Sequence, residues 1–278
     1  MFKYISMKQI AAGNYTYPLY TFEYFLESML RLGVENIELW AAGPHFYLGD
    51  FDTPMLKELK RKIQVRGLHT ICLTPEQCAY PVNIGAKEGY IRKRSMKYFY
   101  RAIEAADVME IPAVLVTPGD GYRNECKEDT WKYTVENLQI LSDYGAKYGK
   151  ILYLEHLTEQ TTNIAVYASE LAALASEVDR DNLICMADTD MMGRCGETLE
   201  DYFKATDGRL GHVHFVDGMP GGHLALGDGK LPLAKFLEEL ERASYKGYIT
   251  LEITNEIYYL DPEKAIGKSL RWLKQYIS

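Results

Sequence analysis

The sequence predicts a (β/α)8 barrel, also called a TIM barrel, and three observations support this fold class. Short runs rich in Ile, Val and Leu alternate eight times with longer segments of helical periodicity. The repeating unit is roughly 35 residues long, and 278 residues is a usual length for one such barrel. No Pro-, Gly- or Ser-rich linker interrupts the alternation. We therefore predict a single barrel domain over residues 1–278, with parallel strands and right-handed crossovers.

The eight predicted strands are short and mostly end at Gly, Pro, Asn, Thr or Asp, which favour turns. They cover residues 5–12, 36–40, 68–74, 113–117, 151–156, 183–188, 210–216 and 248–254. Alternation of such strands with helices implies parallel pairing, and eight units close a barrel better than they fill an open sheet.

Helical periodicity is clear in the first segment between strands, which has one apolar face. Phe22, Phe25, Leu26, Met29 and Leu30 recur there at i, i+3, i+4, i+7 and i+8. In two later segments a capping residue, Thr53 or Asp261, precedes a proline that a first helical turn tolerates. The predicted helices cover residues 21–32, 54–65, 88–109, 127–148, 164–178, 198–204, 233–243 and 262–276.

Composition and charge disfavour several classes of protein. The net charge of -8 repels phosphate backbones and anionic lipids, so we expect neither nucleic acid nor membrane as a partner. The five cysteines are odd in number and form no C-x-x-C pair, which favours a reducing compartment. The N-terminal segment lacks the features of a signal peptide, and no apolar run approaches the roughly 20 residues of a membrane helix. We expect a cytoplasmic enzyme.

Four consecutive predicted strands, the fifth to the eighth, each offer an inward side chain that can bind a metal. Side chains alternate between the two faces of a strand, so apolar neighbours facing the helices turn the polar residue inward. Leu154 thereby places Glu155 inside the barrel, and Leu251 places Glu252 there. The four inward ligand-type residues at similar height are Glu155, Asp188, His214 and Glu252.

Three carboxylates at one end of a barrel repel one another unless a cation neutralises them. Three oxygen donors and one imidazole suit a divalent ion such as Mn²⁺, Mg²⁺, Co²⁺ or Zn²⁺. The alternative is that Glu155 and Glu252 pair with Lys or Arg, but no inward Lys or Arg falls on these four strands. The pattern therefore favours a divalent-metal site.

Several short segments at the predicted strand ends resemble one known family. They are Glu38-Leu-Trp40, Gly43-Pro-His45, Thr74-Pro-Glu76, Leu154-Glu-His-Leu-Thr158, Ala187-Asp-Thr189, Gly211-His-Val-His214, Gly227-Asp-Gly-Lys230 and Gly247-Tyr-Ile-Thr-Leu-Glu252. Together they resemble the sugar isomerases and epimerases of the xylose isomerase-like superfamily. Within it, the chain is most similar to ketose 3-epimerases of the tagatose/psicose kind and to fructoselysine 3-epimerase-like proteins.

The resemblance implies roles for particular residues. The metal, Mn²⁺ before Mg²⁺, Co²⁺ or Zn²⁺, would be bound by the same four residues that strand phase selects. The two glutamates would also act as the acid/base pair on opposite faces of a sugar carbon, through a metal-stabilised enediolate. Trp40, His45, Glu76 and His223 would bind the sugar. Related barrels pair, so we expect a homodimer or homotetramer.

Three positions depart from the tagatose-type pattern. Thr161 and Met191 stand where that pattern has a glutamate and a histidine, and Pro220 stands near the position of an arginine, with His223 within reach. In the family all three contact substrate rather than metal. The resemblance therefore supports the metal site more strongly than it supports a particular substrate. We predict the substrate only as a sugar or sugar derivative.

Other functions on the same barrel stay open. An inosose-type polyol dehydratase or an aldose–ketose isomerase would use much the same metal site, and a non-catalytic sugar-binding barrel would have lost the glutamates. A metallo-endonuclease acting at abasic sites needs more histidines than the six present. His212 fits either a support for the ligands or a core histidine. Residues 227–230 fit a phosphate cradle, or more simply a tight loop.

Overall fold

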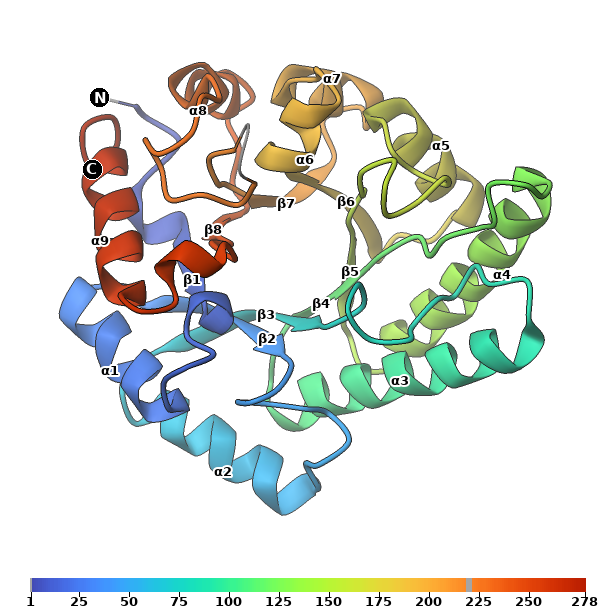
Figure 1. Cartoon of the computed structure of the whole chain (residues 1–278), viewed down its shortest axis with the longest axis horizontal. Helices are drawn as coiled ribbons and strands as arrows, with labels where there is room; N and C mark the ends of the chain where they lie inside the picture. Colours follow the sequence, from blue (N-terminus) through green and yellow to red (C-terminus); the bar gives the residue numbers. More distant parts are fainter. Residues whose placement is uncertain (1, 219–221) are drawn as a thin grey trace.

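The computed structural model describes residues 2–218 and 222–278. Eight parallel strands close into a barrel in sequence order, β1 to β8, with β8 paired to β1. Helices surround the strands on all sides (Figure 1). The predicted (β/α)8 fold is confirmed. No helix in the described part of the chain is long and apolar enough to cross a membrane.

The strand and helix boundaries lie close to the predicted ranges for most elements. The strands are β1 Ile10–Gly13, β2 Asn36–Ala41, β3 His69–Pro75, β4 Ala113–Val116, β5 Ile151–Leu154, β6 Leu183–Asp188, β7 Leu210–His214 and β8 Tyr248–Leu251. The α-helices are α1 Phe22–Leu32, α2 Thr53–Gln64, α3 Gly89–Val108, α4 Lys127–Ala146, α5 Ala168–Val178, α6 Thr189–Arg194, α7 Leu199–Ala205, α8 Leu233–Arg242 and α9 Pro262–Leu273. Three short 3-10 helices complete the described elements, at Met7–Gln9, Asn14–Thr16 and Glu256–Tyr258.

Two predicted element starts were wrong by several residues, and local hydrogen bonds explain both. The first strand begins at Ile10 rather than residue 5, because Gln9 accepts from the backbone N–H of Ser6 and closes a 3-10 turn. The helix predicted from residue 164 begins at Ala168, because the segment before it forms a loop with the β5 end. There the Leu157 N–H donates to the Ala165 carbonyl.

The core has two parts that follow the alternation of the strands. Leu152, Leu154, Ile249 and Leu251 face outward and join helix residues in the larger cluster. The smaller cluster fills the barrel interior with Ala11, Ile71, Cys72, Ala113, Leu115 and Met186. Polar side chains occupy the interior toward the carboxyl ends of the strands, where this architecture places functional groups.

Candidate metal centre

Four side chains meet at the carboxyl ends of β5 to β8. Glu155 directly follows β5, Asp188 ends β6, His214 ends β7, and Glu252 directly follows β8. One ligand atom from each lies within 4.8 Å of the other three. The structure thus brings together the four residues that strand phase selected.

Distances show where these atoms converge. His214 Nδ1 lies 3.0 Å from Glu155 Oε1 and 3.1 Å from Glu252 Oε2. One oxygen of Asp188, Oδ1, accepts the Met191 N–H at 2.8 Å and so caps α6. Its Oδ2 is therefore left to face the group.

The converging atoms have no hydrogen bonds of their own. Glu155 Oε1, Asp188 Oδ2, His214 Nδ1 and Glu252 Oε2 are buried, and their close approaches lack hydrogen-bond alignment. Leaving a buried polar atom unsatisfied costs about 1–3 kcal/mol, and more for a charged one. A cation among them would satisfy all four at once. Three carboxylate oxygens and one imidazole nitrogen fit a divalent ion, and this donor set does not by itself select one metal.

The electrostatics of the group are those of crowded carboxylates. Burial, with the charges of Glu252 and Asp188, raises the pKa of Glu155 to about 7 despite the opposing effect of His214. Burial alone would lower the pKa of His214, but Glu252, Glu38 and Glu155 outweigh it and raise that pKa well above its usual value. Protons and a cation therefore compete for the same atoms.

His223 joins this group, although its predicted role was substrate binding. Its Nε2 lies 3.3 Å from Asp188 Oδ2 and 3.2 Å from Glu252 Oε2. Its Nδ1 lies 3.9 Å from Asp190, a buried carboxylate that also binds Arg194. No pattern in the sequence indicated Asp190, because α6, which carries it, was not predicted. Pro220 lies outside the described residues.

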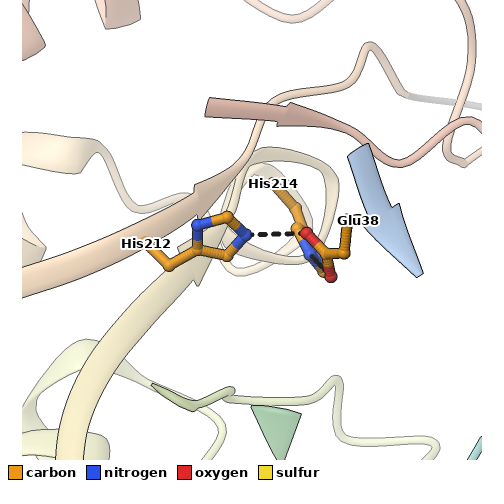
Figure 2. A group of neighbouring side chains, drawn as sticks. All are labelled: Glu38, His212 and His214. Atoms are coloured by element: carbon orange, nitrogen blue, oxygen red, sulfur yellow. Dashed lines mark hydrogen bonds and ion pairs between the residues drawn. The ribbon is translucent and has the colours of Figure 1, made fainter. Parts of the chain in front are cut away.

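A second layer of buried polar groups lies behind His214. Glu38, on β2, is hydrogen-bonded to His212 Nε2 at 2.8 Å and to His214 Nε2 at 3.0 Å (Figure 2). Tyr15 and Thr74 donate their hydroxyls to the same carboxylate. His212 therefore contacts Glu38 rather than Glu155, Asp188 or Glu252.

The predicted sugar-binding residues lie in two different surroundings. Trp40 Nε1 donates to Glu76 Oε2 at 2.9 Å, and the Trp40 ring packs against Tyr15 with centroids 5.6 Å apart. Both ring nitrogens of His45 are engaged within the protein, with Asn14 at 3.1 Å and the Tyr20 carbonyl at 2.8 Å. The structure does not place His45 in the ligand group, which consists of Glu155, Asp188, His214 and Glu252. Its contact with a sugar stays a prediction.

The loop over residues 227–230 is held by an internal carboxylate. Asp217 accepts the backbone N–H groups of Gly227 at 3.0 Å, Gly229 at 2.9 Å and Leu231 at 3.1 Å. Because these amides already have an anionic partner, they do not offer the free N–H groups that a phosphate cradle needs. The structure favours the tight-loop interpretation.

The fold and the ligand group together define a barrel enzyme with a candidate metal centre. Residues 26–276 match the model of the xylose isomerase-like TIM barrels, and the chain belongs to that family. It is 27% identical over 250 residues to the fructoselysine 3-epimerase of Shigella flexneri, covering 89% of this chain and 90% of that protein. It is 25% identical over 263 residues to the L-ribulose 3-epimerase of Methylomonas sp., covering 88% of each. The chain is therefore an enzyme of the isomerase class.

Solved structures share the whole fold. The apo form of 3-keto-D-glucoside 4-epimerase from E. coli has a TM-score of 0.81 at 20% identity, covering 96% of this chain and 99% of that one. The IOLI protein, described with a bound zinc atom, has a TM-score of 0.79 at 20% identity, covering 96% of this chain and 97% of that one.

Proposed function

We propose that this enzyme is a divalent-metal-dependent sugar epimerase that inverts carbon 3 of a ketose or ketose derivative of the fructoselysine or psicose kind. The observation that carries the proposal is the placement of Glu155 and Glu252. They come from β5 and β8, which are not neighbours in the barrel, yet both reach His214 Nδ1 at 3.0 and 3.1 Å. A sugar carbon bound beside this point would have one carboxylate on each side.

Inversion beside a ketone requires two proton carriers on opposite faces of one carbon. A bound divalent cation would polarise the ketone oxygen and stabilise the negative charge that develops when the proton leaves. In our proposal one glutamate removes the proton, and the other delivers a proton to the opposite face of the enediolate. The Glu155 and Glu252 side chains are only 7% and 13% exposed, which limits the access of water to that intermediate.

The substrate proposal draws on the relatives and on the loops. Relatives at 27% and 25% identity are a fructoselysine 3-epimerase and an L-ribulose 3-epimerase. Thr161 and Met191 lack the groups that the tagatose-type pattern places around a free ketohexose, which favours a ketose derivative. The hydrogen bonds of the Gly227, Gly229 and Leu231 amides to Asp217 favour an unphosphorylated substrate at that loop.

A polyol dehydratase is the second candidate, because a relative is named inosose dehydratase. That relative is 23% identical over 168 residues and covers 52% of this chain. Elimination from a ketone also begins with removal of the adjacent proton, so the same two glutamates could start it.

The test is product analysis with a panel of fructoselysine, psicose, tagatose, ribulose, their phosphates and inosose. The metal-stripped enzyme is reloaded separately with Mn²⁺, Mg²⁺, Co²⁺ and Zn²⁺. We expect a 3-epimer from at least one unphosphorylated ketose or ketose derivative, dependent on the added ion. An aldose product or a dehydrated product would instead assign isomerase or dehydratase chemistry to the site.

A further inference from the structure

The two ring nitrogens of His214 differ in their hydrogen bonding, although both lie near carboxylates. Each lies about 3 Å from carboxylate oxygen, Nε2 at 3.0 Å from Glu38 and Nδ1 at 3.0 Å from Glu155. The Nε2 contact meets hydrogen-bond geometry, whereas Nδ1 makes no hydrogen bond although it is buried. Only the contact with Glu38 therefore has the alignment that a hydrogen bond from the ring requires.

We propose that Glu38 is a positioning residue that accepts the Nε2–H of His214 and so directs the Nδ1 lone pair toward Glu155, Asp188 and Glu252. This inference rests on the metal centre of the proposed function. Neutral imidazole carries one proton, and the hydrogen bond at one nitrogen decides which nitrogen is free to bind a metal. Without Glu38, the ring could place its proton on Nδ1, where a cation must bind.

The surroundings of Glu38 leave it only the role of an acceptor. Tyr15 Oη donates at 2.9 Å, Thr74 Oγ1 donates to the same oxygen, and His212 Nε2 lies 2.8 Å from the other oxygen. The side chain is fully buried. A carboxylate surrounded by donors stays ionised and offers no proton, so the facing His214 nitrogen must carry one.

The contact also fixes the ring in space. Figure 2 shows Glu38 reaching from β2 to the two histidines of β7, and these strands are not neighbours in the barrel. The His212 ring stacks on Tyr153 with centroids 5.0 Å apart, which holds the second imidazole that Glu38 binds. Glu38 is thus held in place by several side chains in addition to its contact with His214.

A second cation among Glu38, His212 and His214 is the competing interpretation, since their ligand atoms also lie within 4.8 Å of one another. Hydrogen bonding argues against it. The Nε2 atoms and the Glu38 oxygens already have aligned partners, while the atoms of the first group have none. We therefore expect one bound ion per chain rather than two.

The test compares Glu38→Gln with Glu239→Gln. Glu239 is a carboxylate of similar burial, 2% exposed, but it lies on α8 outside the barrel. We expect Glu38→Gln to weaken Zn²⁺ and Mn²⁺ binding to the stripped protein 10- to 100-fold, as loss of such an outer partner does elsewhere. Glu239→Gln should bind like the wild type. Chelator competition and circular dichroism measure affinity and folding without any substrate.

The second readout needs no variant. In Zn²⁺-loaded wild-type protein with 15N-labelled histidine, NMR should show His214 protonated at Nε2 and free of protons at Nδ1. Protonation at Nδ1, unchanged affinity in a folded Glu38→Gln protein, or two Zn²⁺ ions per chain would each overturn the inference. Because no turnover is measured, a failure of the proposed epimerase activity would be seen separately.

Discussion

His223 Nε2 lies 3.3 Å from Asp188 Oδ2, although Asp188 ends β6 and His223 lies in the loop after β7. His223 has a backbone φ of 48°, in the left-handed region that non-glycine residues adopt rarely and at a cost. The imidazole in this conformation lies beside Asp188 and Glu252, with Nε2 3.2 Å from Glu252 Oε2. The position of His223 fits two roles, contact with the substrate and ligation of the metal. Mutation of His223 can distinguish them.

We predict that His223→Gln raises KM by roughly one order of magnitude, because a hydrogen bond to the sugar is lost. The bound metal should stay at wild-type stoichiometry. Steady-state kinetics and elemental analysis of the same preparation measure both. Loss of the metal would instead make His223 a ligand.

Glu155→Gln and Glu252→Gln should each lower turnover by about two to four orders of magnitude, the usual contribution of a general acid or base. The amide keeps a ligand oxygen but cannot carry the proton. Turnover is measured on the ketose that the wild type epimerises, with metal content checked in parallel. Near-normal turnover in either variant would remove that residue from the acid/base pair.

Asp188→Ala should lose the bound metal and also about 1 kcal/mol of stability, since Asp188 caps α6 through the Met191 N–H. Asp188→Asn keeps an oxygen for the cap and should lose mainly metal affinity. Asp143→Ala is the control, because Asp143 lies at the surface, where it forms an ion pair with Arg180. Unchanged metal content in Asp188→Ala would contradict the ligand assignment.

Metal binding should weaken as the pH falls. Burial lowers the pKa of His214, but the carboxylates of Glu252, Glu38 and Glu155 outweigh it and raise that pKa well above its usual value, so the metal-free site keeps this proton to a higher pH than a free imidazole would. A cation must displace that proton, and its apparent affinity drops as protonation becomes complete. Calorimetric titration in buffers of different ionisation enthalpy should show proton release. Binding without proton release would contradict the assignment of His214.

Met191→His restores a histidine that the tagatose-type pattern has at this position. Met191 lies in α6, three residues after Asp188, and its backbone N–H donates to Asp188 Oδ1. If the pocket otherwise resembles that of tagatose-type epimerases, the variant should gain activity on free ketohexoses relative to the wild type. Parallel assays with tagatose and psicose measure the change. An equal loss on all substrates would place Met191 outside the sugar pocket.

The barrel and the ligand group were accessible from the sequence because both depend on local alternation. Leu154 and Leu251 face the helices, so the next residue, Glu155 or Glu252, faces inward. The four candidate ligands come from consecutive strands, which places them at one end of the barrel without knowledge of long-range packing.

Other features depend on contacts that no local pattern records. Glu38 meets His212 and His214 across 174 and 176 residues of sequence, and only barrel closure brings them together. Helix α6 has 6 residues and begins beside a ligand, so its periodicity was too short to detect. The Asp217 contacts that hold residues 227–231 likewise became visible only in the folded chain.

The most direct test of the account is solvent deuterium incorporation at carbon 3. Stripped and Mn²⁺-reloaded enzyme are incubated in D2O with fructoselysine and with free ketoses, and protein and metal are removed before proton NMR. We predict deuterium at carbon 3 of the new epimer with the reloaded enzyme, and no exchange with the stripped enzyme. A 3-epimer that forms without solvent deuterium, or equal turnover without metal, would contradict metal-dependent proton transfer by Glu155 and Glu252.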